Sequence, residues 1–99
     1  MLEKLTLDDF EPHLNTIFRL PRENADPLEL ELVEITGGGA ADGNSYGFSL
    51  IFRGGLHFVL SQHIFTLEHD RLGPLDIFLV PVAREADGFR YEAVFNHAT

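Results

Sequence analysis

The chain has 99 residues, 44% of them hydrophobic and none of them cysteine, and its formal net charge is −9 at pH 7. This length and apolar content predict a single globular domain over residues 1–99, and the absence of cysteine excludes disulfides, thiolate metal sites and cysteine nucleophiles. The seven Lys and Arg residues are scattered, so we expect neither nucleic acid nor an anionic membrane as a partner.

The N-terminus carries no targeting signal that we recognise. Its first ten residues, MLEKLTLDDF, are acidic and lack the basic stretch and apolar core of a signal peptide. No apolar run in the chain approaches the ~20 residues that a membrane-spanning helix needs. We therefore expect a cytoplasmic protein.

The segment KLTLDDFEPHLNTIF has the features of a short helix. Thr6 can cap the first turn, and the carboxylates after it suit the positive end of the helix dipole. Leu7, Phe10 and Leu14 are spaced to form one apolar stripe. Because Pro12 disfavours helical backbone at the residue before it, we predict only one or two turns, closing one end of a barrel.

From residue 17 onward, apolar and polar residues alternate, which is typical of β-strands. Prolines around residues 21–27, a Gly54–Gly55 pair, Gly73–Pro74 and Asp87–Gly88 mark turns between strands. The expected strands cover residues 17–20, 28–35, 46–54, 56–60, 63–69, 75–82 and 89–96. This spacing predicts a mainly β fold: a small antiparallel barrel or sandwich of about six to seven strands with a short N-terminal helix.

The alternation slips by one residue in the second strand. Leu30 and Leu32 share one face, but Val33 and Ile35 continue the apolar pattern on the other. Such a slip turns the apolar set outward unless a bulge absorbs it, so we predict a β-bulge near Leu32–Glu34.

The most motif-like stretch is EITGGGAADGNSYGFSL, residues 34–50, which holds five of the nine glycines. A phosphate-binding loop would need a lysine directly after its glycines, or a helix after the loop. The only lysine is Lys4, and a strand is expected to follow the glycines. We interpret the stretch as a mobile connection between two strands that could contact a partner.

Histidines and acidic residues raise the question of metal or acid–base chemistry. His63 and His69 share a strand face but lie roughly 20 Å apart along an extended strand, too far to hold one ion. Glu68, His69 and Asp70 resemble an acid–base cluster, yet alternation puts Glu68 and His69 on opposite faces beside a solvated turn. We therefore predict no metal site, no cofactor and no catalytic residue. The five histidines of the chain are His13, His57, His63, His69 and His97.

The segment LDIFLVPV, residues 75–82, is apolar on both faces, unlike a half-solvated antiparallel strand. One face is expected to fill the barrel. The other is expected to lie under the N-terminal helix or another subunit, and the sequence leaves that choice open. This second face is the candidate interaction surface, made of Phe78, Val80 and Val82.

Five stretches together resemble an uncharacterised bacterial family of small stand-alone domains of unknown function. They are LTLDDFEPHLNTIFRL, LELELVEI, FSLIFRG, FTLEHDRLGPLDIFLVPV and YEAVFN, and they span nearly the whole chain. The resemblance implies no catalytic residues. Because such domains are found near phage-tail-like genes, it implies at most a role as an accessory of a phage-tail-like assembly.

Two functions follow as hypotheses. The first is a non-catalytic interaction or structural module that binds a protein partner, or self-associates, through an apolar patch or a strand edge. The alternative is a small-ligand-binding β-barrel or, less favoured, a small enzyme, with its mouth framed by the glycine-rich stretch and His69. Nine phenylalanines in so short a chain favour a filled interior over a ligand cavity.

Overall fold

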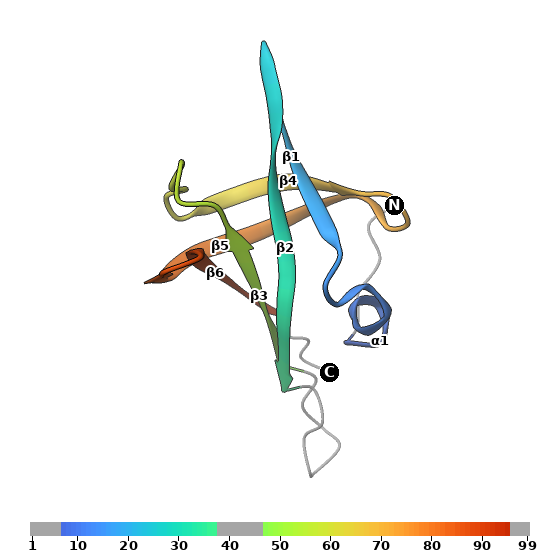
Figure 1. Ribbon diagram of the computed structural model, residues 1–99. Coiled ribbons are helices and arrows are strands. Elements are labelled where there is room, and N and C mark those ends of the chain that lie inside the picture. The colour runs from blue at the N-terminus through green and yellow to red at the C-terminus, as the bar shows by residue number, and fades with distance from the viewer. Residues whose placement is uncertain (1–6, 38–46, 96–99) are drawn as a thin grey trace.

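The structure, a computed structural model, describes residues 7–37 and 47–95, which form a closed antiparallel barrel of six strands preceded by a short helix (Figure 1). The strands run in the order β1-β2-β3-β6-β5-β4 around the barrel, and β4 pairs back with β1. The prediction of a mainly β fold with a short N-terminal helix is confirmed, and of the barrel and the sandwich that the sequence left open, the structure has the barrel. The strands are β1 (Ile17–Arg22), β2 (Ala25–Gly37), β3 (Phe48–Gly54), β4 (His63–His69), β5 (Gly73–Glu85) and β6 (Gly88–Phe95).

Alternating side chains fill the interior of the barrel. In β3, every second residue from Phe48 to Gly54 is buried, and Phe18 from β1 meets Phe52 edge-on with ring centroids 5.2 Å apart. Each large apolar side chain removed from water stabilises the fold by roughly 1.5–3 kcal/mol before entropy is counted. The largest fully buried side chains are Phe10, Phe18, Leu30, Leu32, Leu50, Phe52, Leu67, Ile77, Leu79 and Tyr91.

One end of the barrel is covered by α1 (Leu7–Phe10) and the 3-10 helix η1 (Glu11–His13). Phe10 is fully buried, and its ring contacts those of Phe48 and Phe95 at centroid distances of 6.0 and 5.4 Å. The short helix that the sequence predicts is therefore present, and it is anchored by one aromatic side chain. The predicted cap, Thr6, lies outside the described residues.

At the opposite end, residues 56–60 do not form the strand predicted for them. Because β3 and β4 are not neighbours in the barrel, Gly54–Gly55 is not a hairpin turn, and the chain crosses this end instead. Phe58 and Leu60 pack against the core, and the Leu60 N–H donates a 3.0 Å hydrogen bond to the Tyr91 hydroxyl. The apolar residues at every second position of this segment therefore do not belong to a pleated strand. Phe58 and Leu60 instead attach an irregular segment to the core.

The predicted bulge in β2 is confirmed. The β2–β3 register shifts between Leu32 and Glu34, so that Leu32 stays buried while Glu34 is exposed. A bulge adds local twist to the bent strand, and that twist helps a sheet of six strands to close.

The glycine-rich stretch joins two neighbouring strands, as predicted. Gly37 at the end of β2 pairs with Phe48 at the start of β3, so the two ends of the connection face each other in one antiparallel pair. Residues 38–46 themselves, with the mobility predicted for them, lie outside the described residues.

The β5–β6 hairpin brings the first residue of β6 close to β3. Gly88 has φ +143°, which side-chain-bearing residues rarely adopt, and a Cβ there would overlap the main-chain oxygen of Gly54. Gly73, at the start of β5, also has a positive φ of +77° but has open space around its Cβ position.

We predict that Gly88→Ala lowers the free energy of unfolding by roughly 3 kcal/mol or more, because backbone strain and steric overlap add. Gly73→Ala, which meets only the backbone penalty, should cost about 1–2 kcal/mol. Urea unfolding followed by circular dichroism measures both. Equal losses in the two variants would contradict the close approach of β3 and β6.

Candidate functional site

The seam between β1 and β4, which closes the barrel, has little backbone pairing. Strand β4 pairs with β5 along its whole length, from His63 to His69, whereas its pairing with β1 consists of Arg19 opposite Glu68. Side chains therefore have to hold much of this seam together.

His69, the last residue of β4, supplies that link. Its ring is 6% exposed, and its Nε2 lies 2.9 Å from the Thr16 hydroxyl, just before β1. Its Nδ1 accepts hydrogen bonds from the main-chain N–H groups of Arg71 and Leu72 at 3.0 and 3.3 Å. The Thr16 hydroxyl in turn donates to the main-chain oxygen of His13 at 2.6 Å.

These contacts define one protonation state. A ring nitrogen that accepts from two N–H groups carries no proton, so the single proton of His69 sits on Nε2 and is donated to Thr16. His69 is thus a neutral imidazole whose two nitrogens are both satisfied. No buried side-chain nitrogen or oxygen in the described part of the chain lacks a partner.

The surroundings of His69 favour this neutral form. Burial lowers the pKa of His69 most, and the nearby His13, Arg19 and Arg71 lower it further, while Asp70 acts in the opposite direction. The His13 ring lies 4.5 Å from the His69 ring, centroid to centroid. On the interior side, the ring of Phe18 lies 4.4 Å away.

A surface cavity of about 640 Å³, which we call the seam cavity, opens beside this cluster. It lies between η1, the start of β1 and the turn from β4 to β5. Its charged lining consists of Arg19, Asp70 and Arg71, and an Arg19 Nη donates to an Asp70 carboxylate oxygen at 2.7 Å. This hydrogen bond holds the pKa of Asp70 below its ordinary value.

The prediction that Glu68 and His69 face opposite ways is confirmed: Glu68 is exposed and His69 is buried. Sequence reasoning missed that His13 and Thr16 meet His69. The sequence did carry a signal for the burial of His69. In the alternation of β4, His69 falls on the same inward face as Phe65 and Leu67, so a polar side chain is expected inside the barrel.

The other histidines that the sequence singled out are not drawn together. The ring of His57 contacts that of Phe58, and the ring of His63 contacts that of Phe65, while His97 lies outside the described residues. Within residues 7–37 and 47–95, no three His, Asp or Glu side chains are grouped so that they could hold a metal ion.

The candidate interaction surface lies on the outside of the barrel. Phe78 and Val82 are 47% and 49% exposed and Val80 is half-buried, while the β4 residue opposite Phe78, Ile64, is 60% exposed. We call these four residues the outer face. The sequence left open whether the N-terminal helix or another subunit covers this face. The N-terminal helix does not cover it, because that helix lies at the end of the barrel against β3 and β6.

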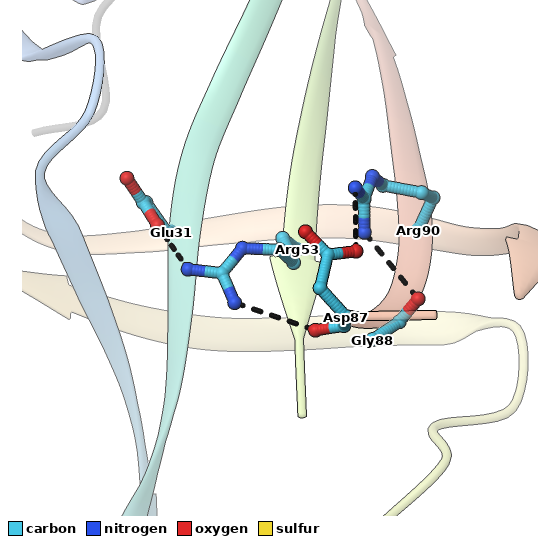
Figure 2. A network of polar contacts seen from close by, with 5 residues as sticks. All are labelled: Glu31, Arg53, Asp87, Gly88 and Arg90. Atoms are coloured by element: carbon cyan, nitrogen blue, oxygen red, sulfur yellow. Dashed lines mark hydrogen bonds and ion pairs between the residues drawn. The ribbon is translucent and has the colours of Figure 1, made fainter. Parts of the chain in front are cut away.

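A chain of polar contacts on β2, β3 and the β5–β6 hairpin is shown in Figure 2. The Arg53 guanidinium donates to Glu31, and to the main-chain oxygen of Asp87 at 3.4 Å. Arg90 donates to the Asp87 carboxylate at 3.0 Å. The hydrogen bond to Glu31 raises the pKa of Arg53, and the one from Arg90 lowers that of Asp87. Asp87 is exposed, whereas Glu31, Arg53 and Arg90 are partly buried. Ion pairs that solvent still reaches stabilise a fold only slightly, so we assign this network to the surface of the barrel wall.

Comparison with known proteins gives one match. The family model described as "Domain of unknown function (DUF6916)" matches residues 5–95. Neither a curated protein nor a solved structure matches the chain. In the part of the chain that the structure describes, no helix has the length and apolarity needed to cross a bilayer.

We predict that Thr16→Val lowers the free energy of unfolding by roughly 1–3 kcal/mol, because it leaves the buried Nε2–H of His69 without an acceptor. Thr66→Val is the matched control. Its hydroxyl also donates to a partner, Asp76 at 2.6 Å, but on the exposed side of the barrel, so we expect a loss below about 0.5 kcal/mol. Chemical denaturation measures both, and equal losses would remove the role given to His69.

The lowered pKa of His69 predicts a pH dependence of stability. As the pH falls through the ordinary histidine value of about 6.5, the unfolded chain takes up a proton that the folded chain refuses, so the folded state loses stability. The contribution is complete above that value and is lost progressively down to the pKa of the folded state.

Denaturation at several pH values between about 8 and 5 should show this loss in the wild type and in His63→Asn, but a smaller one in His69→Asn. NMR titration of the His69 ring provides an independent check. A His69 pKa at or above the ordinary histidine value would contradict the assigned hydrogen bonds.

Proposed function

We propose that this chain, which belongs to the DUF6916 family of domains of unknown function, acts as a non-catalytic interaction module. In this proposal the outer face of β4 and β5 is buried against another protein surface. A second copy of the chain is the partner to which we commit, because the exposed apolar side chains of this face on one copy can be covered by the same face of another.

The observation that carries the proposal is the exposure of the outer face. Ile64 and Phe78 sit directly opposite each other on paired strands, and Val80 and Val82 continue the surface along β5. Scattered exposed apolar residues are common on protein surfaces, but neighbouring ones on paired strands mark sites of association.

The adjoining edge of β4 supports the same proposal. Beyond Glu68, no residue of β4 towards His63 pairs with β1 in the described part of the chain. Pro21, two residues after Arg19, has no N–H with which to extend the pairing. In Figure 1, β1 and β2 run past β4 at a steep angle and do not follow it. An incompletely paired edge beside an apolar face suits strand addition by a partner.

The alternative function, a small-ligand-binding barrel, would need a hollow interior. The interior of the described barrel is occupied by large apolar side chains, among them Phe18, Phe52 and Tyr91, which are all fully buried. Interaction through the exterior is therefore the better supported of the two functions.

A role as an accessory of a phage-tail-like assembly is one use that such an interaction surface could serve. This role rests on the sequence resemblance alone. The expected cytoplasmic location rests on the composition of the N-terminus, and both stay predictions.

We predict that the average mass of the purified chain, measured by static light scattering, rises with protein concentration. Val82→Asp should shift this rise to concentrations at least about tenfold higher, because a charge cannot enter an apolar contact without loss of hydration. Val59→Asp is the matched control, since Val59 is 62% exposed but lies outside the outer face, and the change in net charge is the same.

A strict monomer at every concentration would contradict self-association. Equal effects of the two substitutions would show that the association does not use the outer face.

A further inference from the structure

We propose that the seam cavity is a binding site for a single carboxylate group, held by Arg71 and Arg19 beside His13. This site is separate from the outer face, so it stands or falls independently of the proposed function. The charge of the cavity, the availability of its donors and its mixed charged and apolar lining support this assignment.

The charge of the cavity is opposite to that of the chain. Acidic residues outnumber Lys and Arg by 16 to 7 over the whole sequence, which would leave a typical surface depression negative. The seam cavity instead collects two arginines and two histidines, with Asp70 as its one carboxylate. Glu11 and Glu68 on the flanking elements are exposed and do not line the cavity, although Glu68 lies opposite Arg19 in the β1–β4 pair.

The formal charges fix how much negative charge the cavity can take. His69 is neutral, because Nδ1 accepts two main-chain N–H bonds and Nε2 carries the proton. The two guanidinium groups and Asp70 then sum to one positive charge. One carboxylate neutralises the site, whereas a phosphate dianion would leave it negative beside Asp70.

The donors are available and partly pre-positioned. The backbone of Arg71 is fixed by its N–H bond to His69, and its exposed guanidinium has no ion-pair partner among the described residues. Arg19 uses one Nη for Asp70, whose side chain is 79% exposed, so solvent already competes for that pair. A planar guanidinium keeps further N–H groups for a second carboxylate and matches it in a two-bond fork.

The lining of the cavity combines charged and apolar groups. The side chains of Pro12 and Ile17 form part of its wall beside the two arginines. A carboxylate on a short carbon chain meets both surfaces. Such a group can belong to a free small acid or to an acidic side chain of a protein segment.

Titration of the wild-type chain with sodium acetate, at constant ionic strength set with sodium chloride, tests the site by NMR. We expect saturable shifts of the Arg71 and Leu72 amide signals, because these amides bond to His69 at the edge of the cavity. Inorganic phosphate at the same ionic strength should bind more weakly. A blocked tripeptide with a central aspartate provides the second source of carboxylate.

Arg71→Gln should weaken acetate binding roughly tenfold or more, the loss of a charge-assisted hydrogen bond. Arg84→Gln is the control with the same change in charge, because Arg84 lies over the Phe89 ring, away from the cavity. Tighter binding of the tripeptide than of acetate assigns the site to a protein side chain, and the reverse assigns it to a free acid; both support a carboxylate site. Shifts that do not saturate, tighter binding of phosphate, or an equal effect of Arg84→Gln would overturn the proposal.

Discussion

Closure of the barrel depends on a hydrogen bond between two side chains. The other strand pairs are held by backbone ladders, but β1 and β4 share only the pair of Arg19 with Glu68. His69 takes over by binding Thr16 through one ring nitrogen and the β4–β5 turn through the other. A buried polar ring is tolerated there because every one of its hydrogen-bonding groups is satisfied. These hydrogen bonds require the His69 ring to be neutral. Protonation of the ring at low pH would therefore weaken the closure of the barrel.

A filled interior determines where function can reside. The β1–β4 seam closes around Phe18, Phe52 and Tyr91, and Phe10 covers one end while the segment after β3 covers the other. Because large side chains fill the interior, contacts with other molecules have to be made on the exterior of the barrel. Two exterior features stand out: the apolar outer face around Phe78, and the cationic seam cavity. They lie on different parts of the barrel and would recognise different chemistry, one by burial of apolar area and one by charge.

Both features follow from the way in which the barrel closes. The short β1–β4 pairing leaves part of the β4 edge open next to Ile64, at one end of the outer face. Where β1 and β4 do meet, Arg19, His69 and Arg71 are drawn to one rim, beside His13 from η1. The shortest strand pairing in the barrel is therefore also the place where His69 and the charged side chains of the seam cavity lie.

The sequence by itself determined the elements whose signals are local. Alternation located all six strands of the barrel, the slip at Leu32 located the bulge, and Asp87–Gly88 marked a hairpin, because pleating and turn geometry act over a few residues. Tertiary structure alone decided the matters that depend on strand order. Because β3 and β4 are not neighbours, residues 56–60 cross one end of the barrel and do not form a strand. The N-terminal helix packs at the other end and does not cover the outer face. Tertiary structure also brought Thr16 to His69, which are 53 residues apart, and no local pattern encodes a contact made by closing a barrel.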